Sequence, residues 1–123
     1  MKITQVEIYR FSIPTEPFVI ATGTMYFAQN VLIKILTDDN IYGLGECSAF
    51  PMIVGENQET CIAMAKEFAN ILLGKNPLDI PERMEDLHGY AAHNGTIKSA
   101  FDMALFDISS KNARQPLYKF LGG

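Results

Sequence analysis

The 123-residue chain has few cysteines, no cluster of basic residues and no long apolar run. Its Lys and Arg residues are scattered singly and its net charge is -4, which argues against nucleic acid or an anionic membrane as a partner. No apolar stretch approaches the roughly 18 residues of a membrane span, and the N-terminus has no apolar signal core. The two cysteines, Cys47 and Cys61, fit no metal-binding spacing. They predict reduced thiols in a cytoplasmic protein.

The composition is that of an ordinary globular domain, because 48% of the residues are hydrophobic and 20% are charged. The length suits one domain with a core of its own. The sequence closes on "PLYKFLGG", in which a glycine pair directly follows a helix-like segment. Since Gly-Gly is typical of a connection, we expect the chain to be a fragment to which a further domain is joined.

The first third of the sequence predicts strands, and the remainder predicts helices. Three segments are rich in β-branched and aromatic residues, namely "KITQVEIYRFSI", "NVLIKILT" and "IYGLGEC", and a polar turn joins the last two. Apolar residues then recur at helical spacing in segments that begin near residues 57, 79, 96 and 116. The pattern predicts an α+β fold, a three-stranded antiparallel β-meander followed by a three- to four-helix bundle.

Two connections are more apolar than a solvated loop should be. The segment from Pro14 to Gln29 contains two prolines, a glycine and three aromatic residues, so we interpret it as a long loop rather than a tight hairpin. The segment from Cys47 to Gly55 contains the apolar run "AFPMIV". Loops of about 12–15 residues or more are usually functional or disordered, and apolar side chains argue against disorder. We expect both segments to face another surface.

No complete set of reactive groups can be assembled from the sequence. The Gly-Leu-Gly-Glu run at residues 43–46 is not a phosphate loop, because no Lys-Ser or Lys-Thr follows it and its glutamate would repel a phosphate. His88 and His93 are five residues apart, where a helical metal pair usually needs four. Asp102 and Asp107 fall on different faces of their predicted helix. The sequence therefore predicts residues that could line a binding site, but no catalytic residue and no metal ligand.

Several stretches resemble the N-terminal capping domain of the enolase superfamily, in its muconate-lactonising subgroup. The stretch "YGLGECSAF" resembles the glycine-x-glycine-glutamate strand end of that family, and "IKSAFDMALFDISSKNARQPLYKFLGG" resembles its signature helix. It departs from that signature mildly, at Phe101, Ser110 and Phe120. The stretches "EPFVIATGTMYFAQNVLIKI" and "GECSAFPMIVGENQET" are similar to the two specificity loops of dipeptide epimerases. The resemblance covers essentially the whole chain.

The resemblance implies a fold for this chain and separate roles for the cap and the barrel. Residues 1–123 would form an enolase N-terminal domain-like cap over a C-terminal (β/α)₈ barrel that this chain does not contain. In such enzymes two barrel residues abstract and return a proton alpha to a carboxylate, and Mg²⁺ on three barrel carboxylates stabilises the enolate. The implied partners are the protein's own barrel domain, a small-molecule dipeptide and further copies in a homo-oligomer. The cap itself would contribute positioning and water exclusion.

The resemblance also implies which residues face the substrate. By match to dipeptide epimerases these are Phe18, Gly23 and Thr24 in the first loop and Ile53 in the second. Relatives that act on an acidic second residue carry a cation at the position of Gly23, so its absence favours a neutral or apolar dipeptide. Two alternatives stay open: the cap of a muconate cycloisomerase or o-succinylbenzoate synthase, and a free-standing binding module that grips a peptide with its two loops.

Overall fold

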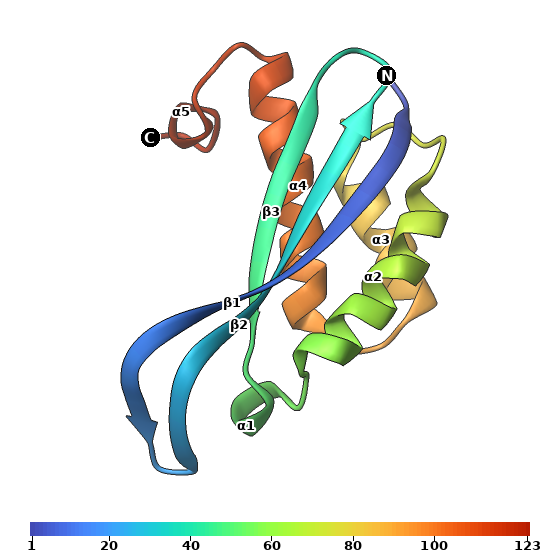
Figure 1. The fold of residues 1–123 in the computed structure, drawn as a ribbon. Coiled ribbons are helices and arrows are strands. Elements are labelled where there is room, and N and C mark those ends of the chain that lie inside the picture. The colour runs from blue at the N-terminus through green and yellow to red at the C-terminus, as the bar shows by residue number, and fades with distance from the viewer.

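A computed structural model describes all residues from Met1 to Gly123, and its sheet has the predicted order and direction. The strands β1 (Ile3–Ile20), β2 (Gly23–Thr37) and β3 (Tyr42–Ala49) form one antiparallel sheet in the order β1-β2-β3 (Figure 1). Ile8 pairs with Ile33, and Ile33 pairs with Gly45 on the other side. The α+β meander expected from the sequence is confirmed.

The interpretation of residues 14–29 as a long loop was wrong. β1 continues to Ile20, β2 begins at Gly23, and only two residues connect them. The prolines are tolerated because the pairing is irregular between Pro14 and Phe18, and because β1 is an edge strand that need not donate every ladder hydrogen bond. The two strands therefore extend past the body of the sheet as a curled hairpin, which we call the arm (residues 12–29; Figure 1).

Five helices follow the strands, and two of them are single turns: α1 (Pro51–Val54), α2 (Gln58–Leu72), α3 (Ile80–Tyr90), α4 (Gly95–Asn112) and α5 (Leu117–Phe120). The helix start predicted near residue 57 is confirmed, and Asn57 is its N-cap, because the Asn57 side chain accepts from the Thr60 amide and the Thr60 hydroxyl accepts from the Asn57 amide. Gly74, in the left-handed region, follows the end of this helix. None of the helices combines the length and apolarity needed to cross a bilayer.

The core lies between one face of the sheet and the helices α2, α3 and α4 (Figure 1). Alternate residues of β2 point into it, and Val31, Ile33 and Ile35 are fully buried. The helices contribute Phe68 and Phe101, whose rings meet edge to face at 5.6 Å between centroids. This packing fixes the sheet as a rigid base from which the arm projects.

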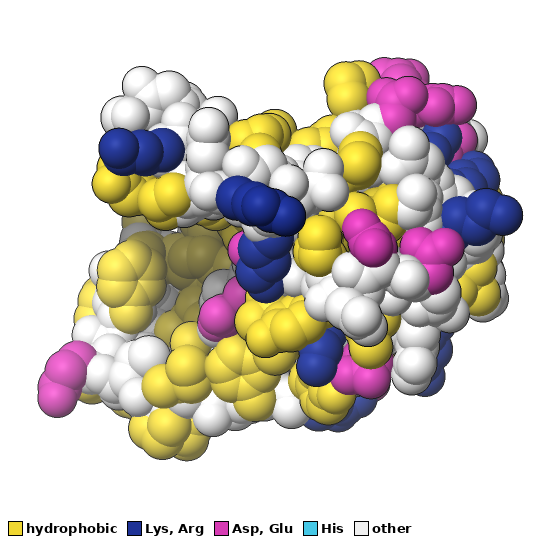
Figure 2. Space-filling model, turned by 90° about the horizontal axis from the view of Figure 1, so that it is seen from above, with side chains coloured by type: hydrophobic (Ala, Val, Ile, Leu, Met, Phe, Trp, Pro, Cys, Tyr) yellow, Lys and Arg dark blue, Asp and Glu magenta, His cyan; other side chains and the backbone are white.

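The opposite face of the sheet carries no helix layer and remains open. Tyr9, Tyr42 and Leu44 are between 41% and 47% exposed on it. Seen from the end of the molecule that lies at the top of Figure 1, the surface is hollowed at the left of the view, with hydrophobic side chains along the hollow (Figure 2). A monomeric protein rarely leaves such contiguous apolar surface without a partner.

The outer edge of β3 is closed by side chains of α4. The Asp107 carboxylate accepts a hydrogen bond from the Leu44 amide at 2.9 Å, and the Lys111 ammonium donates to the Tyr42 carbonyl at 2.7 Å. The two side chains also pair with each other at 2.9 Å. Exposed strand edges invite pairing with other chains, and here the edge is occupied by charged groups of the same domain.

Candidate functional site

The arm and the segment after β3 enclose an apolar hollow of about 410 Å³. Its walls come from both segments, and its apolar lining is formed by Phe18, Met25, Phe27, Ala28 and Phe50. Thr15, Glu16 and Ser48 complete the rim. Small-molecule sites are typically concave and mostly apolar, with a few polar groups that fix orientation. This hollow has that character.

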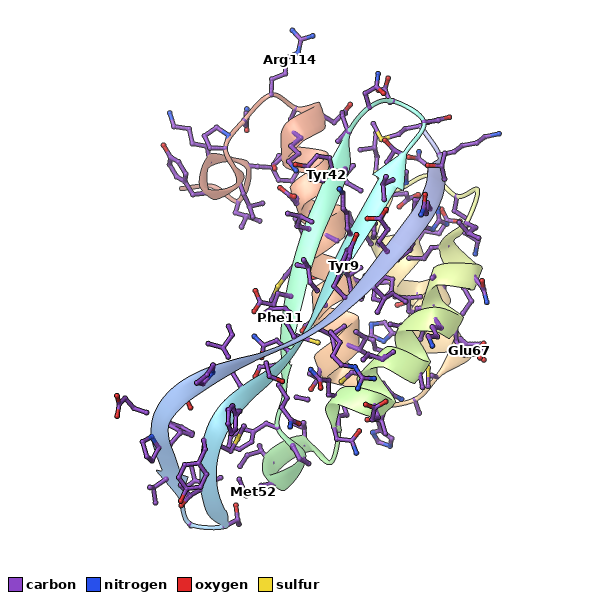
Figure 3. The ribbon with its side chains drawn as sticks, in the orientation of Figure 1. Tyr9, Phe11, Tyr42, Met52, Glu67 and Arg114 are labelled. Carbon is purple, nitrogen blue, oxygen red and sulfur yellow. The ribbon has the colours of Figure 1, made fainter.

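The arm contacts residues 47–57, which contain α1 and which we call the α1 segment. The rings of Phe18 and Phe50 lie 6.1 Å apart between centroids and are tilted by 57°. Near the tip of the arm, a Cβ atom added to Gly23 would lie 2.6 Å from the Met52 sulfur, so Met52 occupies the space that any side chain there would need. Met52 lies beside the curled end of the arm (Figure 3). The two segments are therefore one unit at this end of the molecule.

The four residues expected to face a substrate all lie at this end, but they are placed differently. Phe18 lines the hollow. Gly23 lies under Met52 at the tip of the arm, and Thr24 pairs with Val19 and is exposed. Ile53 lies in α1 and is 62% exposed, outside the lining of the hollow. The structure thus brings Phe18 and Phe50 together and leaves the other three around them.

Reasoning from the sequence did not assign Met25, Phe27 and Phe50 to the site, although it recognised their segments as apolar. The missing information was the strand register: Met25 stands opposite Phe18, and Phe27 stands opposite Pro14. The sequence of residues 18–28 has no period-two alternation that would have indicated this pairing, because its apolar residues form two continuous runs. Nothing in the sequence shows how the arm curls toward Phe50.

Reactive groups do not converge on the hollow. Glu16 is the one charged residue in its lining. Across the chain, no group of three His, Cys, Asp or Glu side chains is placed to hold a metal ion. The residues present do not fit Mg²⁺, which needs a nearly octahedral set of oxygen ligands. What the site can do by itself is bind, orient and exclude water.

Comparison with known protein families identifies the family of the chain. The model of the mandelate racemase / muconate lactonizing enzyme N-terminal domain matches residues 3–122. The chain belongs to this family. In the enolase superfamily such a unit is a capping domain, and the resemblance inferred from the sequence is confirmed.

Individual relatives agree with the family assignment of this capping domain. A D-Ala-D/L-Ala epimerase of Cytophaga hutchinsonii is 40% identical over 100% of the chain and 34% of the relative. Its structure, a complex with Mg and the dipeptide D-Ala-L-Val, superposes with a TM-score of 0.97 over 100% of this chain and 34% of that one. A dipeptide epimerase from Enterococcus faecalis, solved with Mg and L-Leu-L-Tyr, is 32% identical with a TM-score of 0.96, over 100% and 35% of the two chains.

A muconate lactonizing enzyme from Mucobacterium smegmatis, solved with muconolactone, is also similar to the capping domain. It is 35% identical with a TM-score of 0.87, over 100% of this chain and 34% of that one. The chain spans about a third of the length of the curated relatives it matches.

A second hollow of the capping domain is polar and lies between α3 and the start of α4. His88, His93, Lys98 and Asp102 are among its lining residues. The Lys98 ammonium is used internally, because it donates to the Ala91 carbonyl at 2.6 Å. Burial raises the pKa of the Asp102 carboxyl, and no counter-charge offsets it. The two histidines share this hollow without the further ligands that a metal site would require.

The two cysteines lie in the core and are not reactive groups of the site. Cys47 and Cys61 are both free and buried. A hydrogen bond with the Cys61 thiol, together with burial, raises the pKa of the Cys47 thiol far above its usual range. Both thiols are buried in the core, so neither is accessible to a ligand in the hollow.

Proposed function

We propose that this chain is the specificity cap of a Mg²⁺-dependent dipeptide epimerase, in which a proton alpha to a carboxylate is removed and returned. The observation that carries the proposal is the apolar hollow between Phe18 and Phe50, a concave wall without a reactive group. It lies in a capping domain whose relatives include dipeptide epimerases. A wall of this kind suits a domain that recognises the substrate while another part of the protein reacts with it.

The residues of the cap act by positioning and by excluding water. Phe18, Phe27 and Phe50 offer apolar surface to a substrate side chain, and closure over the substrate removes water from the charges that develop beneath. In a low-dielectric site those charges interact more strongly with the groups that stabilise them. Holding the reacting carbon near its base also lowers the entropic part of the activation free energy for proton abstraction.

The partner of the cap is the C-terminal (β/α)₈ barrel of a longer protein. Relatives are about three times as long as this chain, which supports a second domain of that kind. The acid, the base and the Mg²⁺ ligands belong to the barrel, since no carboxylates of the cap converge on a metal. When bound, Mg²⁺ supplies positive charge that stabilises the enolate oxygen.

Assembly and location complete the proposal. The open face of the sheet, with Tyr9 and Tyr42 exposed, supports contact with the barrel or with a second copy in a homo-oligomer. Two free core thiols support a reducing, cytoplasmic location.

The substrate is a neutral or apolar dipeptide. The hollow is lined mainly by aromatic and aliphatic side chains, and Gly23 places no cation near it. Met52 covers Gly23, so a side chain at this position would displace the end of the Met52 side chain. Glu16, the charged residue at the rim, repels a second acidic group.

A muconate cycloisomerase cap is the second candidate, because a muconate lactonizing enzyme shares the fold at 35% identity. The two functions are separated by presenting the full-length protein with a panel of dipeptides and with cis,cis-muconate in deuterium oxide. Incorporation of one deuteron into L-Ala-L-Phe or L-Ala-L-Val, ahead of L-Ala-L-Glu, is the expected result by mass spectrometry. Turnover of muconate without exchange in any dipeptide would replace the proposal with the second candidate.

A further inference from the structure

The root of the arm is held by two buried polar side chains, Asn30 and Gln58, and by the exposed Glu46. Phe11 and Asn30 are partners across β1 and β2, at the rung where the two strands leave the helix layer. Phe11 lies at this point, between the body of the sheet and the curled arm (Figure 3). Asn30 is 7% exposed although it is polar, and burial of a polar side chain costs free energy unless hydrogen bonds offset it. Its side-chain NH₂ and its backbone carbonyl are hydrogen-bonded, whereas its side-chain oxygen has no partner.

Gln58 bridges the two strands of the arm at this rung. It is the first residue of α2 and is 8% exposed. Its side-chain amide donates to the Phe11 carbonyl at 3.0 Å and to the Asn30 carbonyl at 2.9 Å. One NH₂ group therefore uses both of its hydrogens to tie the two strands to the beginning of α2.

The side chain of Asn30 makes a second tie, to β3. Its amide donates to the Glu46 carboxylate at 2.5 Å, a short charge-assisted hydrogen bond. Glu46 lies just before the segment that contains α1, and Gln58 lies just after it. Asn30 is thus bonded to both ends of the α1 segment, through its side chain at one end and its carbonyl at the other.

The arm has no core of its own, because no residue between 12 and 29 is buried. It pairs with β3 only at its last residue, where Gln29 stands opposite Ala49. Its other contacts with the α1 segment are between exposed or half-buried residues, such as Phe18 on Phe50 and Gly23 against Met52. The hydrogen bonds at the root are therefore the buried polar tie between the arm and the rest of the domain.

We propose that Asn30, Gln58 and Glu46 form a joint that fixes the arm against the α1 segment and so shapes the hollow between them. The three act as positioning residues, because none of them lines the hollow. This inference rests on the proposed function for its effect on substrate, whereas the mechanical role of the joint stands on the hydrogen bonds alone. A loosened joint would widen the hollow and weaken substrate binding without touching the chemistry.

The test uses Gln58→Met in the protein expressed from its complete reading frame. Methionine keeps the length and apolar packing of the side chain but donates no hydrogen bond. The matched control is Arg10→Met, which removes the exposed Arg10–Glu59 ion pair between the same strand and the same helix. A second variant, Glu46→Gln, keeps an acceptor for Asn30 but removes its charge, and should speed exchange in residues 12–29 less than Gln58→Met does.

The first readout is hydrogen exchange of the arm and of α4, followed by mass spectrometry. Loss of both Gln58 bonds should speed exchange of amides in residues 12–29 roughly tenfold while α4 is unchanged, and Arg10→Met should change neither by more than about twofold. An unchanged exchange rate in the arm would contradict the proposed joint. An equal rise in the arm and in α4 would also overturn it, because that result describes general loss of stability.

The second readout is the kinetics of dipeptide turnover. Gln58→Met should raise KM by roughly tenfold and leave kcat within about twofold, as expected when ground-state and transition-state binding are lost together. Locally faster exchange with an unchanged KM would overturn the link between the joint and substrate. If the parent protein turns over no dipeptide, the proposed function fails, and the exchange experiment still decides whether the joint holds the arm.

Discussion

Gly45 of β3 lies against the backbone of Ala100 in α4 so closely that a Cβ atom on Gly45 would be 1.8 Å from the Ala100 carbonyl oxygen. Gly43 has the same relation to Ala104, one helical turn further on, at 2.0 Å. The two glycines are two residues apart, so they lie on the same face of the strand. The two alanines are four residues apart, so they lie on the same face of the helix, and each glycine faces one alanine. The Gly-x-Gly motif is therefore a packing motif that lets helix and strand approach.

Substitution of Gly45 by alanine should destabilise the domain strongly. The new methyl group would meet backbone, which cannot rotate away, so the helix must shift from the sheet at a cost of about 1–3 kcal/mol or more. Gly89→Ala is the matched control, because Gly89 lies in α3 with nothing within 4 Å of an added Cβ. Its substitution should be neutral or stabilise by about 0.5–1 kcal/mol. Denaturant unfolding measures both, and similar midpoints for the two variants would contradict the packing argument.

Asp102→Asn should stabilise the domain at neutral pH. Burial raises the pKa of Asp102 in the folded state, so ionisation above that pKa opposes folding. This penalty disappears as the pH falls through the folded-state pKa, and the parent and the variant should converge near the unfolded value of about 4. Thermal unfolding between pH 3 and 8 tests the sign. A variant that is less stable than the parent at pH 7 would show that Asp102 has a stabilising partner.

Asp86→Asn should have the opposite effect. Partial burial acts to raise the pKa of Asp86, but hydrogen bonds from Lys75 and Arg83 outweigh it, and the net pKa is lowered. A lowered folded-state pKa stabilises the fold above about pH 4, and the contribution is lost as the pH falls through the folded value. The variant should be less stable at pH 7, since the buried Arg83 loses one of its two carboxylate partners and keeps only Glu82. A constant difference between parent and variant down to pH 2 would be inconsistent with this cause.

Local signals in the sequence were enough for most of the fold. The signals for the helix start near residue 57 and for the strand "NVLIKILT" each act within a few residues, and the structure confirms both elements. The arm could not be predicted in this way, because Pro14 and Pro17 locally disfavour a strand and the pairing partner is set by tertiary structure. The site depends on the same long-range geometry. Phe50 reaches Phe18 only because the arm curls back, and no local pattern encodes that bend.

Ile53→Ala and Phe18→Ala should both change dipeptide preference more than the rate of the chemical step. Phe18 should have the larger effect, because it lines the hollow, whereas Ile53 is mostly exposed beside it. One or two methylenes in a binding pocket are worth about 1–3 kcal/mol of discrimination. Val54→Ala, in the same short helix as Ile53, serves as the control. The ratio of kcat/KM for L-Ala-L-Phe and L-Ala-L-Ala is the measurement, and an unchanged ratio in the Ile53 variant would remove Ile53 from the site.

The central claim is that this domain recognises the substrate and leaves proton abstraction to another part of a longer protein. The most direct measurement is NMR of the alpha protons of L-Ala-L-Ala in deuterium oxide with Mg²⁺, using residues 1–123 alone and the full-length protein side by side. The full-length protein should exchange one alpha proton and lose this activity when EDTA removes the metal, whereas residues 1–123 should give the protein-free rate. Exchange catalysed by residues 1–123, abolished by substitution of one of their own lysines, would contradict the account.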